Sequence, residues 1–410
     1  MKLQNTNASM LLLVAVFVAA SAGCNDSAVP PIANRSGESA DEIADDRTDG
    51  KESTDLSVEE PSEVHEMESA VAVLDELEPK PMTPSADFEL LRGLADASKS
   101  DSDGNLTELH FRSEAVSDEV ASEIGNCSTL VKLTINHSEM SLVGWEQLAK
   151  LTELQQFDLR GCEVDNEQLA AAVQGMPKLR ALRLNGQSGD TTVDDLGMEV
   201  LKGCKSLKAL ALDHLWVGGD GLSELVGLNS LSELYLAGTL VEDDAMKVIA
   251  QFRGLKKLRL AQTSVGDVGM EAVIALPLED LDLSECSQIN NQALGHIGSM
   301  KSLKKLNLFK TVIADEGIAD LAALKQLAWL NVDQTPVSDR GMETIGKLEN
   351  LTFLHLGSTA VTDKGMPNLS SLKQLEKLIV TRTAVTQAGV EPLKQQNPQL
   401  SVQLKYVEGS

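Results

Sequence analysis

Six histidines and five cysteines are the residues of this chain best suited to metal binding or nucleophilic catalysis. None of them form a cluster at the spacing of metal ligands. The sequence has no G-x-S-x-G, H-E-x-x-H or Walker motif, so it lacks the short signatures of hydrolases, zinc peptidases and nucleotide-binding enzymes. Residues 217–221 read Val-Gly-Gly-Asp-Gly and resemble a phosphate loop, but their place in the repeat described next makes them a turn. We therefore expect no catalytic residue, no cofactor and no metal site.

A leucine pattern recurs about every 24 residues, and it must position any side chain that binds a partner. Its cleanest copy, residues 351–372, reads LTFLHLGSTAVTDKGMPNLSSL. The twelve copies begin at Leu106, Leu130, Leu154, Leu179, Leu207, Leu231, Leu255, Leu278, Leu303, Leu327, Leu351 and Leu375. Eleven intervals of 23 to 28 residues with one leucine code predict a stack of similar units, each packed on its neighbours.

Each unit predicts one strand and one short helix. Leu354 and Leu356 lie two residues apart, so both side chains point to the same side of a strand. Apolar residues at helical spacing occur in the second half of a unit, as in residues 342–348. Twelve parallel strands at about 4.8 Å would form a sheet roughly 55 Å long. An Asp at the start of the helix, as in Asp315 and Asp339, is expected to cap it, and a Gly two residues later suits close packing.

The pattern resembles that of leucine-rich repeat proteins from Leu106 to the C-terminus. The resemblance implies an α/β solenoid, a right-handed leucine-rich repeat horseshoe with a parallel sheet on the concave face and short helices on the convex face. In that family the ninth position of a unit is Asn or Cys, whose buried side chain bonds adjacent turns. Here it is Cys at Cys162 and Cys286 and Thr in six other units, and we expect the Thr hydroxyl to do the same.

The repeats contain two further cysteines, Cys127 and Cys204. With these four cysteines the chain resembles the cysteine-containing subclass of this family. Its eukaryotic members often carry an F-box, but no F-box-like helical domain precedes the repeats here. Cys162 and Cys286 are five units apart, about 24 Å at the strand spacing, which is too far for a disulfide. We expect all four to be buried free thiols.

The third, fifth and seventh positions of each unit should face the concave side, and most of them are polar. Four aromatic residues also fall there, and two polar residues accompany them: Tyr235, Phe309, Trp329 and Phe353, with Asp333 and His355. Exposed aromatic residues grouped on a rigid sheet are suited to a binding hot spot. The alternative is that these rings pack only on one another or lie under a terminal segment. Trp145 and Trp216 fall on the turn or helix side and are expected to be packing residues.

The N-terminus predicts export. Residues 1–23 read as a signal peptide, because the apolar run 10–22 is too short to span a membrane comfortably. The sequence Ser-Ala-Gly-Cys ending at Cys24 resembles the lipobox of bacterial lipoproteins, which implies lipid attachment at Cys24 and a membrane anchor. It departs from that motif at Ser21, where the family prefers Leu. The alternative is ordinary cleavage after Ala22, which would release a periplasmic or secreted protein.

The remaining segments have distinct compositions. Residues 24–84 are acidic and poor in large apolar residues, so we expect a disordered tether. Residues 85–105 are expected to form an N-terminal helical cap, with Ser85 capping a helix that ends near Leu94. Twelve repeats occupy residues 106–399, and residues 400–410 should form an edge strand and tail. The repeat unit at 179 is four residues longer than the others, in a loop at 186–192, which is either a binding element or a tolerated insertion.

The charge of the chain excludes two classes of partner. The net charge of −27 combines −16 from residues 25–104 (22 acids, 6 bases), −12 from residues 105–410 (40 acids, 28 bases) and +1 from Lys2. Such an acidic chain is a poor match to nucleic acid or to an anionic membrane surface. We therefore expect a non-enzymatic module on the bacterial cell envelope that binds a protein or polysaccharide. The alternative is a structural or adhesive envelope component without a discrete hot spot.

Overall fold

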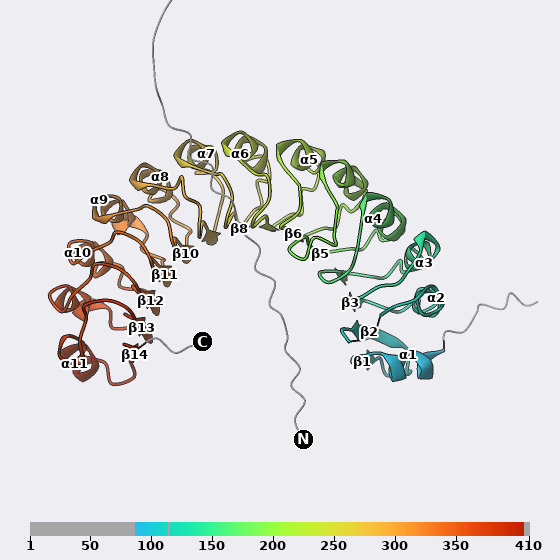
Figure 1. Ribbon diagram of the computed structural model, residues 1–410, viewed down its shortest axis with the longest axis horizontal. Helices are drawn as coiled ribbons and strands as arrows, with labels where there is room; N and C mark the ends of the chain where they lie inside the picture. Colours follow the sequence, from blue (N-terminus) through green and yellow to red (C-terminus); the bar gives the residue numbers. More distant parts are fainter. Residues whose placement is uncertain (1–86, 114, 406–410) are drawn as a thin grey trace, which may run out of the picture. The chain divides into compact units, whose positions relative to one another are not determined.

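The computed structural model describes residues 87–113 and 115–405. The predicted signal peptide, the lipid-attachment residue Cys24 and the acidic tether lie outside these residues. The described part is one curved array in which strands line the inner side of an arc and helices line the outer side (Figure 1). Its strands form a single sheet that follows the order of the sequence. The predicted α/β solenoid is confirmed.

Twelve parallel strands, β2 to β13, each carry the leucine segment of one unit. The strands of the sheet are β1 (Ala97–Ser100), β2 (Leu106–Phe111), β3 (Lys132–Ile135), β4 (Gln156–Asp158), β5 (Ala181–Asn185), β6 (Ala209–Asp213), β7 (Glu233–Tyr235), β8 (Lys257–Arg259), β9 (Asp280–Asp282), β10 (Lys305–Asn307), β11 (Trp329–Asn331), β12 (Phe353–His355), β13 (Lys377–Ile379) and β14 (Ser401–Gln403). The helices of the convex side are α1 (Phe88–Leu94), α2 (Asp118–Gly125), α3 (Leu142–Leu148), α4 (Asn166–Val173), η1 (Asp195–Gly203), α5 (Gly219–Glu224), α6 (Asp243–Ile249), α7 (Asp267–Ala272), α8 (Asn291–Ile297), α9 (Asp315–Ile318), η2 (Ala319–Ala323), α10 (Met342–Ile345), η3 (Met366–Ser371) and α11 (Gln387–Gln396).

The core is a set of aliphatic layers between the sheet and the helices. Equivalent leucines pair in register across the strands, as Leu330 with Leu354 and Leu354 with Leu378, and all three are fully buried. The residues on either side of each leucine therefore form rows across the inner face, because side chains alternate along a strand. The same register places position three of every unit in one row and position five in another. These two rows form the candidate site together with position seven, which lies at or just after the end of each strand and includes Phe309 and Asp333.

The ninth position behaves differently for its two residue types. Thr335 and Thr359 each donate to the carbonyl three residues earlier in their own turn, at 2.6 Å. The expectation that Thr bonds the adjacent turn is therefore wrong, because its short hydroxyl reaches the carbonyl of its own turn first. The two cysteines do cross to the preceding unit: Cys162 Sγ lies 3.0 Å from the Ile135 oxygen, and Cys286 Sγ lies at the same distance from that of Leu260.

The recurring Asp near the helix start, such as Asp315, accepts hydrogen bonds from the following unit. The expectation that it caps its own helix is therefore wrong: α9, which begins at Asp315, has no side-chain cap. Asp315 Oδ1 accepts from the amides of Ser338 at 2.8 Å and Gly341 at 3.0 Å. Asp339 accepts from Thr362 in the same way, at 2.7 Å. A Cβ at Gly341 would lie 2.8 Å from Asp315 Oδ1. At Gly341 the absence of a Cβ thus leaves room for the carboxylate of the preceding unit, whereas the unit that begins at Leu278 carries Ala293 at this position.

The ends of the array differ from the predicted caps. Helix α1 begins at Phe88, and its cap is Asp87, which accepts from the Leu90 amide at 2.9 Å. The predicted cap Ser85 lies outside the described residues. The N-terminal cap was predicted to be helical, but it also contains a strand. This strand, β1, pairs antiparallel with β2 and covers the first edge of the sheet. At the other end β14 adds in parallel to β13. Within residues 87–113 and 115–405, no helix has the length and apolar character that crossing a bilayer requires.

Candidate functional site

Trp329 and Phe353 lie side by side in the row formed by position three. The backbone register pairs them directly across β11 and β12. Their rings stack with centroids 4.8 Å apart and planes within 5° of parallel. Lys305 of β10, next in the row, places its Nζ 5.0 Å from the centroid of the Trp329 ring, which is a cation–π contact. Both rings are half-buried, so one side of the stack remains open to a partner.

His355 links this stack to a carboxylate. Its ring meets Phe353 edge-on, with centroids 6.5 Å apart at 81°. Its Nε2 lies 3.8 Å from Asp333 Oδ2. Burial lowers the pKa of His355, Asp333 opposes that shift, and Lys377 adds to it. The imidazole is therefore neutral at pH 7 and offers one donor and one acceptor beside the rings.

A pocket of about 350 Å³ lies next to the stack. Phe309, Asp333 and His355 line it together with Gln334, Ser358, Lys377, Ile379, Thr381, Arg382 and Gln403. The structure thus brings five of the predicted residues into one continuous surface on β10 to β12 and the turns after them. We call it the aromatic surface, made of Phe309, Trp329, Asp333, Phe353 and His355. It combines open apolar rings with a few hydrogen-bonding groups, which is the composition of a binding interface core.

Tyr235 lies apart from the aromatic surface. It is on β7, three strands from β10 in the sheet order. Its hydroxyl donates to Glu233 at 2.8 Å, and burial raises its pKa. The strands around it carry paired charges, such as Lys257 with Glu233 at 2.9 Å. Tyr235 therefore lies on the concave face but not beside the other aromatic residues, because its unit is not adjacent to theirs, and its role in binding stays a prediction.

The two tryptophans outside the concave face have opposite environments. Trp145 is fully buried in α3, as expected for a packing residue. Trp216 is 74% exposed, so the expectation that it packs is wrong. It occupies the tenth position of its unit, just after the turn, and Leu240 at the same position of the next unit is also exposed.

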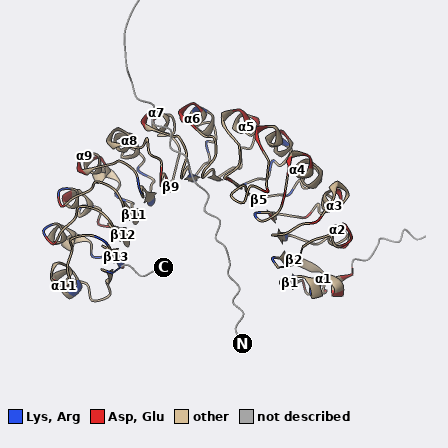
Figure 2. Cartoon of the chain, viewed as in Figure 1, with Lys and Arg blue, Asp and Glu red and all other residues tan. Residues whose placement is uncertain are grey.

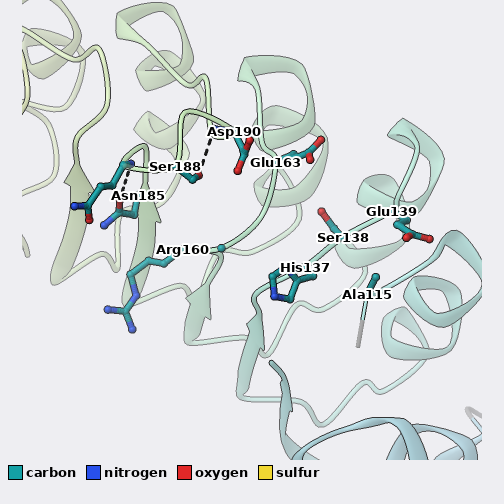
Figure 3. A pocket seen from close by; sticks show the side chains of 11 residues that line it. Ala115, His137, Ser138, Glu139, Arg160, Glu163, Asn185, Ser188 and Asp190 are labelled. Atoms are coloured by element: carbon teal, nitrogen blue, oxygen red, sulfur yellow. Dashed lines mark hydrogen bonds between the residues drawn. The ribbon is translucent and has the colours of Figure 1, made fainter. Parts of the chain in front are cut away.

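A second hollow lies at the opposite end of the array (Figure 3). It has a volume of about 650 Å³ and is lined by Ala115, His137, Ser138, Glu139, Arg160, Gly161, Glu163, Asn185, Gln187, Ser188 and Asp190. The extra residues 186–192 form one wall, so the insertion shapes a cavity at the rim of the sheet. Thr191 fixes this loop by donating to the Cys162 oxygen at 2.7 Å. The only sequence signal for this hollow was the length of the unit that begins at Leu179.

The histidine, cysteine and acidic side chains of the described part do not meet the geometry that a metal ion requires. Among residues 87–113 and 115–405 there is no group of three or more His, Cys, Asp or Glu side chains that could hold a metal. Cys127, Cys162, Cys204 and Cys286 are free and buried. Burial raises the pKa of the Cys127 and Cys162 thiols to about 12, so neither is a nucleophile at neutral pH.

Comparison with known proteins agrees with this architecture. Residues 277–397 match the family model described as "Leucine-rich repeat region". An internalin from Listeria monocytogenes is similar in structure at 22% identity and a TM-score of 0.54, over 73% of this chain and 80% of the internalin. A leucine-rich repeat protein from Leptospira interrogans aligns at 18% identity and a TM-score of 0.46, over 72% and 82% of the two chains. No curated protein sequence matches the chain.

The family match covers the C-terminal units, and the likeness to the internalin extends over most of the array. Together with the leucine code and the ordered parallel sheet, these findings assign the fold. Residues 277–397 are a leucine-rich repeat region, and the whole described array has the fold of leucine-rich repeat proteins.

Proposed function

We propose that this protein is a non-enzymatic binding module whose aromatic surface holds a protein or glycan partner. The observation that carries the proposal is the Trp329–Phe353 stack, which is partly open and lies beside a pocket of about 350 Å³. Stacked rings lose little conformational freedom on binding and bury a large apolar area, so they suit the centre of an interface. The neighbouring Asp333 and His355 would supply directional hydrogen bonds.

We also propose that the module is displayed on the bacterial cell envelope. The support is the apolar run 10–22 followed by Cys24, in a sequence similar to a lipoprotein lipobox. Acylation of Cys24 with more than one chain would anchor the protein stably to a membrane. The acidic residues 24–84 would then separate the repeats from the membrane surface, because like charges extend a chain.

The proposed function is tested by capture of partners from an envelope extract with the full chain. The matched variant is Trp329→Asp/Phe353→Asp, which places charge on the aromatic surface without changing a core leucine. Circular dichroism melts establish that both proteins are folded. The proposal expects a partner that the parent captures and the variant does not.

Two results would contradict it. If parent and variant capture the same partners, the aromatic surface is not the site. If neither captures any, the array is better explained as a structural or adhesive component that makes many weak contacts.

A further inference from the structure

We propose that the N-terminal part of the concave sheet is a second binding site, specific for a carboxylate-rich segment of a partner protein. It is built by Arg112, Lys132, Arg160 and Arg183, which come from four successive units on β2 to β5 or the turns after them. With His110, Thr134, Asn136, Gln156 and Asp158 they line a hollow of about 420 Å³. We call these four cations the basic surface.

The acidic residues of this region are already engaged. Asp158 holds Arg160 through two contacts, Oδ1 to Nε at 2.9 Å and Oδ2 to Nη2 at 2.8 Å. Glu108 is paired with Lys99 at 3.0 Å, at the margin of the hollow. Within residues 87–113 and 115–405, no carboxylate lies within ion-pair distance of Arg112, Lys132 or Arg183.

The centre of the same sheet is arranged differently. There Lys257 pairs with Glu233 at 2.9 Å, and Lys305 pairs with Asp280 at 3.6 Å. Arg259 lies between Asp213 at 3.4 Å and Asp282 at 3.5 Å. At the centre of the concave face, the cations Lys257, Arg259 and Lys305 are therefore all ion-paired. Within the described residues Lys377 on β13 also lacks an ion pair, but only at the N-terminal end do three such cations, Arg112, Lys132 and Arg183, lie close together around one hollow. In a chain whose net charge is −27, this grouping marks that end as a site for an external anion.

The acidic excess of the array lies largely elsewhere. Figure 2 shows acidic positions on the outer helices α4 to α7, on the side of the arc opposite to the strands. In Figure 3 the Arg160 side chain extends away from Glu163 and Asp190, the acidic residues of the rim hollow. The Arg160 guanidinium is thus directed away from the acidic residues of the rim hollow.

The spacing of the cations fits an extended acidic peptide. Four neighbouring strands span about 14 Å, which is the length of roughly four residues of extended chain. A peptide that crosses the strands would meet one cation on each, and Arg can bind a carboxylate through two parallel hydrogen bonds. The amide side chains of Asn136 and Gln156 in the same hollow can bond the peptide backbone.

A nucleic acid is a poorer match to this surface. Single strands are held by aromatic rings on which bases stack, and no Phe, Tyr or Trp lines the hollow. The stacked pair Trp329–Phe353 is on β11 and β12, six strands from β5, which is about 29 Å at the strand spacing.

The test measures binding of a fluorescein-labelled octaglutamate peptide to the full chain by fluorescence anisotropy at about 50 mM salt, where screening is moderate. The diagnostic variant is Lys132→Gln/Arg183→Gln. The matched control is Lys257→Gln/Arg259→Gln, which removes the same charge from the centre of the concave face, where the cations are ion-paired. An unlabelled oligothymidylate and inorganic phosphate serve as competitors.

The proposal expects the parent and the control to bind the peptide alike, and the diagnostic variant to bind it at least about tenfold more weakly, the loss of one or two charge-assisted contacts. The variant Trp329→Asp/Phe353→Asp should bind the peptide as the parent does. The proposal for the basic surface is therefore tested independently of the proposal for the aromatic surface. Three results would overturn it: no peptide binding by the parent, equal losses in both charge variants, or displacement of the peptide by oligothymidylate or phosphate at lower concentration than by free octaglutamate.

Discussion

The Trp329 indole and the Phe353 phenyl ring stack with centroids 4.8 Å apart and planes within 5° of parallel. Each ring comes from a different repeat, so the pair ties two strands together and also presents an apolar surface on the concave side. Such a stack contributes about 0.5–1.5 kcal/mol beyond area burial. A stabilising role and a binding role of the stack predict different losses in the free energy of unfolding when one ring is removed.

If the stack is kept for binding, Trp329→Ala should lower the free energy of unfolding by about 1–2 kcal/mol, the stacking contribution plus the burial of a half-buried ring. The matched control is its neighbour Leu330→Ala, which empties a fully buried position and should cost about 2–5 kcal/mol. Urea denaturation followed by circular dichroism measures both. Equal costs would show that Trp329 is chiefly a packing residue.

The contact between Asp315 and Gly341 predicts strong coupling between successive units. Asp315→Ala leaves two amides without their acceptor and should cost about 1–3 kcal/mol of stability. Gly341→Ala should cost about as much, because the new Cβ would lie 2.8 Å from the carboxylate oxygen. In the double variant the clash is gone, so the costs should fall short of additivity by at least about 0.5 kcal/mol.

The control for this double-mutant comparison is Gly295→Ala in α8, where the nearest atom to an added Cβ is 3.8 Å away. Alanine is the better helix former, so this change should leave stability unchanged or raise it slightly. If the stability costs of Asp315→Ala and Gly341→Ala are strictly additive, the glycine is not required by the carboxylate.

His355 predicts a pH dependence of stability. Burial lowers its pKa below the usual 6.5, so between these two values the unfolded chain binds a proton that the folded chain does not. Its contribution to stability is therefore complete above pH 6.5 and is lost as the pH falls through the folded-state pKa. The free energy of unfolding should drop between pH 7.5 and pH 5 by more in the parent than in His355→Asn. An identical pH profile for the two proteins would contradict this account.

The buried cysteines make the state of Cys24 measurable. Cys127, Cys162, Cys204 and Cys286 are at most 3% exposed, so none should react quickly with a thiol reagent in the native protein. If Cys24 is acylated, protein isolated from a bacterial membrane should show no fast thiol under native conditions and four after denaturation. One fast thiol, absent in Cys24→Ser, would instead indicate ordinary signal cleavage.

The repeat code predicted the strands well, because a leucine that must be buried in every unit leaves a signal at fixed spacing. Leu330, Leu354 and Leu378 are where that signal places them. The turn after each strand was less predictable. The eighth position of eight successive units is left-handed, with φ between 50° and 65°, yet only Gly238 among them is a glycine. Residues such as Glu285 and Lys310 adopt this conformation because the neighbouring turns impose it.

The candidate site was predictable where neighbours in the repeat are also neighbours in space. Trp329 and Phe353 occupy the same position in adjacent units, and these two facts together predicted that they are neighbours. Tyr235 shares the concave face, but its unit is not adjacent to theirs, and it lies on β7, three strands from β10. The exposure of Trp216 and the unpaired state of Arg112 and Arg183 depend on which side chains reach them from other units. Such contacts leave no trace in the spacing of residues along the chain.

The measurement that tests the central claim most directly is the affinity of the captured partner for single variants of the concave face. Trp329→Ala and Phe353→Ala should each weaken binding by about 30-fold, the 2 kcal/mol typical of a hot-spot residue. Tyr235→Ala, an aromatic residue on the same face outside the aromatic surface, should weaken it by less than about threefold. Equal effects at all three positions would show that binding is spread over the face, and no effect at Trp329 and Phe353 would contradict the proposed site.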